Sequence, residues 1–445
     1  MSVKKKSRSR IFFGWWSVSF IGLISGVGHG FNTYGISVLF LPISAELGLN
    51  RAATSWAPGI GRLEGGFTSP LVGWLSDKFG PRWIVVFGIL VAGAGMIIMN
   101  FITEAWQYYI AWGALIGLGL NIGLTVAVDK TINDWFMRRR GLAQGIKFAA
   151  ISILGIIVVQ VITPLMKIFQ QGEIPGWRFT CFLFGIIILA SIPLAYVFVR
   201  PHRPEHYGML PDGADIGERK EGEEVDMESR GAGYASSYEE IEYTFRQAIK
   251  TATFWLLLAT FSVHNIVSGG FNLHIHPFLT DAGLTEETAS AMMGFMIFFT
   301  VPSRFFGGLV ADRVPKNRIQ YLLTVAFLFQ VIGLSTYLSF QNIPAAYVLL
   351  ACHGLSSGAV TPLVIIVLGR YFGRKAFGSI LGTTVAVLSP LGMLAPVFYG
   401  WVFDTTHSYN NAFITGLVLA VMAVVVSCLV RIPKLPAEER KELDW

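Results

Sequence analysis

Residues 73–83 read GWLSDKFGPRW, and residues 308–318 read GLVADRVPKNR. Both stretches place an aspartate four residues after the first glycine and a basic residue directly behind it, and they begin 235 residues apart. Two more pairs of stretches share almost the same spacing: LGLNRAATSW from 47 matches AGLTEETASAM from 282, and WFMRRRGLAQG from 135 matches YFGRKAFGSILG from 371. Three paired landmarks at nearly one offset indicate two halves of similar architecture in one chain.

The composition places these halves in a lipid bilayer. Of the 445 residues, 53% are hydrophobic and 14% are charged, and the mean hydropathy is +0.56. Uncharged apolar runs such as CFLFGIIILASIPLAYVFV at 181–199 are long enough to cross about 30 Å of hydrocarbon as helices. Barrel strands would alternate apolar and polar residues over about ten positions, and these runs do not. We therefore predict an all-α polytopic membrane protein.

Twelve membrane-spanning helices are predicted, six in each half and related by a pseudo-twofold axis along the membrane normal. Their expected ranges are 12–41, 52–76, 82–103, 106–134, 140–167, 177–200, 251–278, 286–311, 318–340, 344–371, 376–403 and 410–431. An even number places both termini on one side. Basic residues collect in the connections on that side, starting with KKKSRSR at 4–10, and the positive-inside rule makes it cytoplasmic. The opposite connections carry few basic residues, chiefly Arg51, Lys167 and Arg178.

The expected organisation follows from these ranges: a basic tail at 1–11, a first half at 12–200, a cytoplasmic linker at 201–250, a second half at 251–431 and a tail at 432–445. The linker is rich in Gly and Glu and poor in apolar residues, which predicts disorder ending in a short amphipathic helix. About fifty such residues do not form a catalytic domain, so we expect no enzyme activity and no cofactor.

Several partner classes are excluded by the same features. The cysteines Cys181, Cys352 and Cys428 lie inside predicted spans, which indicates neither a disulfide framework nor a metal site. The net charge of +6 follows from the membrane topology and gives no reason to expect nucleic acid. We expect a monomer in the lipid bilayer whose other partner is a small solute.

Arg304 lies inside the apolar stretch FMIFFTVPSRFFGGLVAD at 295–312. Eight residues of helix, about 12 Å, separate it from Asp312 at the cytoplasmic boundary. A charge at that depth costs at least about 2.5 kcal/mol, which favours a position facing a watery cavity or a partner. We favour a substrate or counter-ion role for Arg304, and the alternative is an arm that snorkels to the interface.

Lys147 lies seven residues past Arg140 in the fifth span, about 10 Å deep. It either joins Arg304 in a cationic site or snorkels, and the sequence leaves both open. Together, the two cations would make an anion the natural cargo, because a guanidinium fork matches a carboxylate.

The second span contains GRLEGG, with Arg62 and Glu64 about 200° apart around the helix. They cannot both face one cavity, so one of them is expected to contact a neighbouring helix. Glu64 is the candidate for a protonatable carboxyl near mid-membrane. The alternative is an ion pair, for example with Lys147.

Uncharged polar residues recur at matching heights in both halves. Span four carries a stripe of polar residues at four-residue spacing, and span ten carries polar residues 236 positions later. This match favours a cavity lining over simple helix packing. His276, before Pro277, is expected at the outer surface. The candidate substrate-binding residues are Arg304, Lys147, Asn32, Tyr34, Asn121, Thr125, Asn272, Ser357 and Thr361, and the proton-coupling candidates are Glu64, Asp129, His264 and His353.

Over its full length the chain resembles the major facilitator superfamily, most specifically in the stretch after span two and its copy after span eight. The resemblance implies a secondary transporter with alternating access. It also implies a cytoplasmic gate in which the signature residues latch helix ends; the alternative is a charge cluster that only sets topology. The gate residues are Gly73, Asp77, Gly80 and Arg82, with Asp312 and Arg313 from the second copy.

Within that superfamily, WFMRRRGLAQG and PSRFFGGLVADRVPKNRIQY resemble the monocarboxylate transporters and the oxalate/formate exchangers. In that group an arginine at the position of Arg304 pairs with the substrate carboxylate. Two positions depart from the mammalian members: Thr300 stands where they have Asp, and Gly35 where they have Lys. Proton coupling through those two groups is therefore not transferred.

The expected function is secondary active transport of a small organic anion, preferably a monocarboxylate, by proton symport in the plasma membrane. The alternatives are export of neutral or cationic compounds by proton antiport, with Glu64 or Asp129 as the key carboxylate, and a non-transporting membrane sensor acting through residues 201–250.

Overall fold

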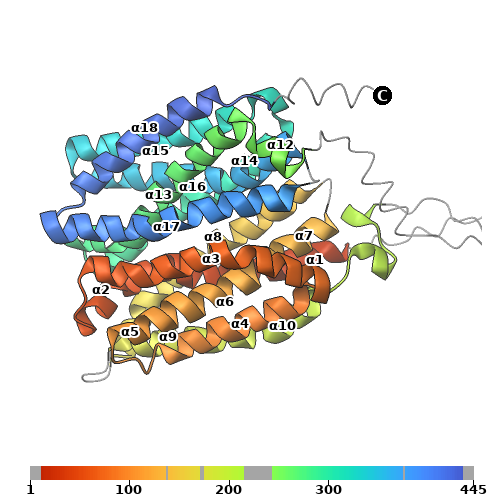
Figure 1. Cartoon of the computed structure of the whole chain (residues 1–445). Coiled ribbons are helices and arrows are strands. Elements are labelled where there is room, and N and C mark those ends of the chain that lie inside the picture. The colour runs from red at the N-terminus through yellow and green to blue at the C-terminus, as the bar shows by residue number, and fades with distance from the viewer. Residues whose placement is uncertain (1–11, 137–138, 171–174, 215–242, 374–375, 434–445) are drawn as a thin grey trace, which may run out of the picture.

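The computed structural model describes residues 12–136, 139–170, 175–214, 243–373 and 376–433, and in these ranges the regular elements are all helices. The predicted tails at 1–11 and 434–445 and most of the linker, residues 215–242, lie outside the described residues. Two bodies of helices lie against each other in Figure 1, the first half in red to yellow and the second in green to blue.

The first half contains these helices: α1 (Phe13–His29), η1 (Gly30–Gly35), α2 (Ile36–Glu46), α3 (Arg51–Phe79), α4 (Pro81–Ile98), α5 (Ala105–Tyr108), η2 (Tyr109–Gly117), α6 (Leu118–Asn121), η3 (Ile122–Val126), α7 (Ala127–Trp135), α8 (Arg140–Ile168), α9 (Gly176–Ala190) and α10 (Ile192–Phe198). Three of these elements, η1, η2 and η3, are π-helical turns. Such turns interrupt α-helices most often at functional sites. They lie in the first and fourth predicted spans, where the polar candidates Asn32, Tyr34, Asn121 and Thr125 were located.

The second half contains α13 (Ala252–Asp281), α14 (Glu286–Arg313), α15 (Gln320–Phe340), α16 (Ile343–Phe372), α17 (Phe377–Thr406) and α18 (Asn410–Leu429). The short turns η4 (Pro204–Tyr207) and η5 (Pro211–Gly213) begin the linker, the helix α12 (Phe245–Ile249) ends it, and η6 (Lys316–Arg318) joins α14 to α15. The short helix predicted at the end of the linker is therefore present.

Ten helices of the described chain are long and apolar enough to cross a membrane. The other two predicted spans correspond to the continuous run α1, η1 and α2, and to α3, whose 29 residues include Arg62 and Glu64. Large apolar side chains on the outside, such as Trp401, Phe298 and Val425, face the position of lipid.

The repeat extends to the backbone of the turns that precede α3 and α14. Gly48 and Gly283 both adopt positive φ, at 61° and 87°, in the left-handed region that glycine tolerates best. Two residues later, the side chains of Asn50 and Thr285 accept hydrogen bonds from the first turns of α3 and α14. The same local chemistry therefore starts both helices, at the offset found in the sequence.

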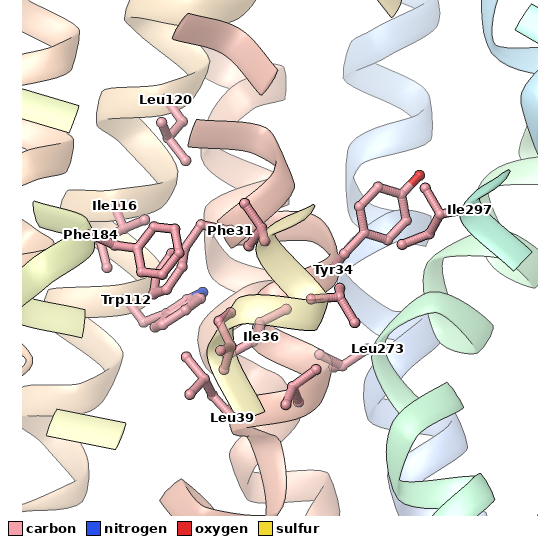
Figure 2. Packing of buried hydrophobic residues seen from close by; sticks show 14 of the residues in the cluster. Phe31, Tyr34, Ile36, Leu39, Trp112, Ile116, Leu120, Phe184, Leu273 and Ile297 are labelled. Atoms are coloured by element: carbon pink, nitrogen blue, oxygen red, sulfur yellow. The ribbon is translucent and has the colours of Figure 1, made fainter. Parts of the chain in front are cut away.

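The halves meet along two helix pairs, α3 with α17 and α14 with α8. Since α14 repeats α3 and α17 repeats α8, these two pairs are related to each other by the pseudo-twofold. Inside the first half, apolar side chains around Phe31, Trp112 and Phe184 fill the space between helices, whereas Tyr34 points the other way, toward Ile297 of the second half (Figure 2). Tyr34, one of the polar candidates, therefore lies at the interface between the halves.

Candidate functional site

Arg304 lies in the α14–α8 pair, with 8% of its surface exposed. Its Nη1 donates to the main-chain oxygen of Phe148 at 3.1 Å and to Oγ of Ser152 at 2.7 Å, both on α8. Its Nε is buried without a hydrogen-bond partner, and Nη2 forms no hydrogen bond with the described residues. No acidic side chain among the described residues forms an ion pair with it. The guanidinium is therefore held in place by neutral groups and keeps its charge uncompensated.

A directed chain of hydroxyl groups supports this arginine. Oγ of Ser152 lies 2.6 Å from Oγ1 of Thr300, and Thr300 donates to the main-chain oxygen of Ile297 at 2.7 Å. Because Thr300 uses its proton on Ile297, Ser152 donates to Thr300 and accepts from Arg304. Thr300, which stands at the position where the related mammalian transporters have an acid, thus supports the arginine as a neutral hydrogen-bonding group.

Lys147 is 2% exposed and forms an ion pair with Asp129 of α7. The structure therefore gives Lys147 an acidic partner within its own half, and excludes the ion pair with Glu64 considered above. Its Nζ lies 4.1 Å from the centre of the Phe148 ring, and the guanidinium carbon of Arg304 lies 5.8 Å from the same centre. Both cations therefore lie near one aromatic ring, and among the described residues an acidic partner is present for Lys147 but not for Arg304.

The side chains of Arg62 and Glu64 have different surroundings, as expected from their positions on different faces of the helix. Nη1 of Arg62 donates to the main-chain oxygen of Gly392 on α17, at 3.1 Å, so Arg62 faces the second half. Glu64 has one carboxylate oxygen, Oε2, that is buried without a hydrogen-bond partner in the described structure. The sequence left open which of the two contacts a neighbouring helix, and the structure assigns that contact to Arg62.

The polar candidates of the first half divide into two groups. Tyr34 is 3% exposed and packs over Gly155 of α8, next to Ile297 (Figure 2). Asn32 lies with it on η1 and is partly exposed. In contrast, Nδ2 of Asn121 donates to the main-chain oxygens of Gly61 and Gly117, at 2.8 and 2.9 Å, and joins two helices.

His29 of α1 connects the polar stripe of span four to the charged residues. Its Nε2 lies 3.3 Å from the main-chain oxygen of Leu124 and 3.4 Å from Oγ1 of Thr125. The same helix α1 packs along α8, where a Cβ at Gly22 would lie 3.6 Å from Cα of Lys147. Helix α1 therefore lies between the polar stripe and the helix that carries Lys147.

The candidates of the second half form a separate cluster. His353 is fully buried, with Nδ1 2.9 Å from Oε1 of Gln330 and Nε2 3.3 Å from Oδ1 of Asn272. Nδ1 of His264 lies 3.3 Å from Oγ of Ser268 on its own helix. Ser357 is buried, and Thr361 donates to the main-chain oxygen of Ser357, so its hydroxyl proton is used within α16.

At the end of the bundle that the positive-inside rule predicts to be the outer one, Arg51 at the start of α3 joins the two halves. Its two terminal nitrogens donate to the carboxylate of Asp281 at 2.6 and 2.8 Å, and Nη1 also donates to the hydroxyl of Tyr409 at 2.5 Å. The guanidinium stacks on the ring of Phe403, 3.6 Å from its centre. Asp404 accepts from the main-chain nitrogens of Arg51 and Ala52, and so caps α3 across the interface. We call Arg51, Asp281, Phe403, Asp404 and Tyr409 the outer gate.

The outer gate continues inward through His274, which is 1% exposed. Nε2 of His274 lies 2.8 Å from the main-chain oxygen of Pro396 and 3.1 Å from Oγ of Ser55 on α3, and Nδ1 lies 3.1 Å from the hydroxyl of Tyr409. Because a carbonyl only accepts, Nε2 carries the proton and Nδ1 accepts from Tyr409. Burial raises the pKa of Tyr409 above the usual phenol range, so its hydroxyl stays available as a donor.

The expectation for His276 was wrong. It is 2% exposed rather than at the surface, because Ser37 contacts its main-chain nitrogen at 3.1 Å and Ser290 its Nε2 at 3.3 Å. The sequence did not predict the outer gate either. One signal in the sequence could have indicated it: basic residues are scarce on that side. Arg51, Lys167 and Arg178 each form an ion pair with an acid in the structure.

The predicted cytoplasmic gate is described in part. Gly80 has φ of 77°, which lets the chain turn sharply between α3 and α4. Nε of Arg82 donates to the main-chain oxygen of Val199 at 2.9 Å, and its guanidinium lies over Tyr196, so it ties α4 to α10 within the first half. Arg313 is exposed at the end of α14. The side chains of Asp77 and Asp312, and the surroundings of Gly73, lie outside the described residues.

Among the described residues, no three His, Cys, Asp or Glu side chains lie together in a group that could hold a metal ion. The site consists of the buried Arg304, the half-buried Arg62, one internal ion pair and neutral polar groups between two helical halves. Such a site can bind and release a charged solute.

A family model described as Major Facilitator Superfamily matches residues 22–393. The chain belongs to the major facilitator superfamily. It is a multi-pass membrane transporter and not an enzyme.

Among curated proteins, this superfamily member is similar to monocarboxylate transporters. It is 25% identical to monocarboxylate transporter 4 of Gallus gallus over 97% of this chain and 88% of that protein. It is 26% identical to monocarboxylate transporter 3 of Rattus norvegicus over 95% and 81%, and 24% identical to monocarboxylate transporter 2 of Homo sapiens over 97% and 88%.

Among solved structures, the fold is similar to that of a bacterial homologue of the human lysosomal transporter Spinster. The inward-facing unoccupied form gives a TM-score of 0.62 at 15% identity, over 96% of both chains. The inward-facing occupied form gives 0.65 at 14% identity, over 93% of this chain and 96% of the other. At such low sequence identities, the structural similarity supports only the fold.

Proposed function

We propose that this transporter moves a small organic anion, a monocarboxylate in the first instance, by proton symport across the plasma membrane with both termini in the cytoplasm. The observation that carries the proposal is the uncompensated guanidinium of Arg304 between α14 and α8. A carboxylate would supply the missing charge and match the fork of N–H donors. The names of the curated relatives agree with this cargo.

The charge balance of the site favours one anionic group over a cation. Lys147 and Asp129 neutralise each other, so the site around Arg304 carries a net positive charge before cargo binds. A cationic solute would add a second positive charge in a region of low dielectric, where like charges repel strongly. The exporter alternative with Asp129 as the key carboxylate is disfavoured because Lys147 already occupies Asp129.

We assign the coupled proton to Glu64. It lies on α3, which belongs to the interface between the halves, and it has no ion-pair partner among the described residues. A carboxyl group in that setting can take up a proton on one side of the membrane and release it on the other as the halves rock. Asp129 is held by Lys147, and His353 by Gln330 and Asn272, which makes them less available as proton carriers.

Alternating access requires the outer gate to break. Its ion pair, cation–π contact and helix cap all join α3 of the first half to α13, α17 and the start of α18 in the second. In our proposal the cytoplasmic signature residues, Asp77 and Arg82 with Asp312 and Arg313, latch the opposite end when the outer gate opens.

The experiment is uptake into proteoliposomes of purified protein. Labelled lactate, pyruvate, formate and oxalate are each offered with and without an inward proton gradient. We expect at least one of the monocarboxylates to accumulate, and to accumulate more with the gradient. Accumulation of a neutral or cationic compound driven by an opposite gradient would replace the proposal with the exporter, and no transport of any of these compounds would favour a sensor.

A further inference from the structure

We propose that Arg62 forms a second anion site, which the carboxylate occupies on the outer side of Arg304 during transport. The inference rests on the proposed function, because it concerns the path of the same cargo. Arg62 was noticed in the sequence only as the neighbour of Glu64, and the function proposed above makes no use of it.

The surroundings of Arg62 are built for a guanidinium. Its Nη1 donates to the main-chain oxygen of Gly392 on α17. A Cβ at Gly269 of α13 would lie 2.6 Å from that nitrogen, and a Cβ at Gly392 would lie 3.7 Å from Cδ of Arg62. Two glycines of the second half therefore leave the room that the arginine occupies.

The charge of Arg62 is available to a ligand. None of the described acidic residues forms an ion pair with it. Its Nε and Nη2 form no hydrogen bond with the described residues, and neither is fully enclosed. Through Nη1 the guanidinium reaches α17 of the second half, so Arg62 lies at the interface between the halves.

The repeat gives the height of Arg62 relative to Arg304. At the offset of 235, Arg62 corresponds to Ile297 on α14, seven residues and about 10 Å outward of Arg304. At the offset of 236, Gly392 corresponds to Ile156 on α8, eight residues and about 12 Å outward of Phe148. The two helix pairs therefore independently place Arg62 about 10 to 12 Å outward of Arg304.

The two arginines lie in the two helix pairs that join the halves, Arg304 in the α14–α8 pair and Arg62 in the α3–α17 pair. Arg304 binds α8 and Arg62 binds α17, which are repeat-related helices on either side of the pseudo-twofold. A Cβ at Gly392 would lie 2.5 Å from Oδ1 of Asn265 on α13 as well as 3.7 Å from Cδ of Arg62. From outside, the order is the outer gate, then Arg62, then Arg304.

The separation decides what the two sites can do. A monocarboxylate has one acidic group and cannot pair fully with two guanidiniums about 10 Å apart in depth. It would therefore bind first at Arg62 and then at Arg304 when entering from outside, and in the reverse order when leaving. Removing the charge of Arg62 should weaken capture at the outer face more than at the cytoplasmic face.

The test uses three variants of the full-length protein in oriented proteoliposomes, with labelled lactate as the probe. Arg62→Gln keeps an amide donor for the oxygen of Gly392 but removes the charge, Arg62→Lys keeps the charge, and Arg62→Met removes both. We expect Arg62→Gln to raise the KM for lactate at the outer face about ten-fold or more, with a smaller change at the cytoplasmic face. Arg62→Lys keeps the charge but loses the planar fork, so its KM should rise less than that of Arg62→Gln.

Lys167→Gln is the matched control, because it removes an exposed positive charge from the outer side of the membrane, paired with Glu287. A wild-type KM in Arg62→Gln together with an impaired Arg62→Met would overturn the inference and leave Arg62 as a structural bond to α17. An equal rise of KM at both faces would overturn the outer placement.

The failure of this inference is distinguishable from failure of the proposed function. Loss of transport in Arg304→Gln with unchanged kinetics in Arg62→Gln keeps the function and removes the outer site. A wild-type protein that neither moves lactate, pyruvate, formate or oxalate nor is stabilised by any of them overturns both.

Discussion

Lys147 and Arg304 lie at similar depth on facing helices, with 2% and 8% of their surfaces exposed, and they share the ring of Phe148. Lys147 has a carboxylate within its own half, whereas Arg304 is held by a main-chain oxygen and a hydroxyl. Burying a charge is costly unless it is paired, so the protein stabilises one cation itself and leaves the other to be neutralised by something else. The comparison separates a cation that supports the fold from one that is available to cargo.

The largest effect is expected from Lys147→Met, which leaves Asp129 charged and unpaired. Breaking a buried ion pair in this way typically costs about 3–5 kcal/mol of stability. We expect a strong fall of the apparent Tm in detergent, measured by fluorescence. The double variant Lys147→Met with Asp129→Asn should recover much of the loss, and a double variant no more stable than the single one would contradict an ion pair.

Next is Arg304→Lys, which keeps the fold but loses most carboxylate uptake. A lysine retains the charge and loses the planar fork, and hydrogen bonds to charged groups are worth about 1.5–3 kcal/mol each. We expect uptake of lactate or pyruvate to fall by about ten-fold or more, with a Tm close to wild type. Normal uptake in this variant would contradict the anion site. A large loss of Tm would mean that Arg304, like Lys147, mainly stabilises the fold.

A smaller effect is expected at the outer gate, where Arg51 is fully partnered but partly reached by solvent. Asp281→Asn weakens the ion pair, which at such a position is worth about 1 kcal/mol or less. The outward-open population should rise by up to about five-fold. The measurement is the rate at which an impermeant maleimide labels a cysteine introduced at Ser55, beneath the gate, in a background with Cys352 and Cys428 replaced. Labelling no faster than in the parent would argue against the gate.

The smallest effect is expected from Ser152→Ala. It removes the hydroxyl that accepts from Arg304 and donates to Thr300, while the bond to the oxygen of Phe148 remains. One hydrogen bond is worth about 0.5–1.5 kcal/mol, so the KM for the transported acid should rise a few-fold. Thr180→Ala is the control, because that buried hydroxyl donates to the main-chain oxygen of Gly176 within its own helix α9. Equal changes in both variants would show a general packing effect.

Much of the fold was predictable because bilayer thickness fixes helix length and the repeat fixes register. The span predicted at 286–311 is α14 (Glu286–Arg313), and that predicted at 410–431 is α18 (Asn410–Leu429). The glycines of the turns at Gly48 and Gly283 recur at the repeat offset in the sequence. Both have positive φ in the structure, which gives the physical reason for the recurrence.

Less of the site was predictable, because pairing between distant residues is not encoded in spacing. The depth of Arg304 and Lys147 followed from counting residues, but the partner of Lys147 did not, and Asn121 is used for helix packing where a cavity contact was expected. The outer gate joins residues separated by more than 200 positions, and its members looked like ordinary helix ends in the sequence.

The sequence by itself determined that this chain is a two-half membrane transporter with an arginine deep in its eighth span, because lipid forces apolar helices and makes every buried charge conspicuous. Only the tertiary structure decided which charges remain uncompensated. That depends on the rotation and approach of neighbouring helices over a few ångströms, which set whether an acid reaches Lys147, Arg304 or Arg62.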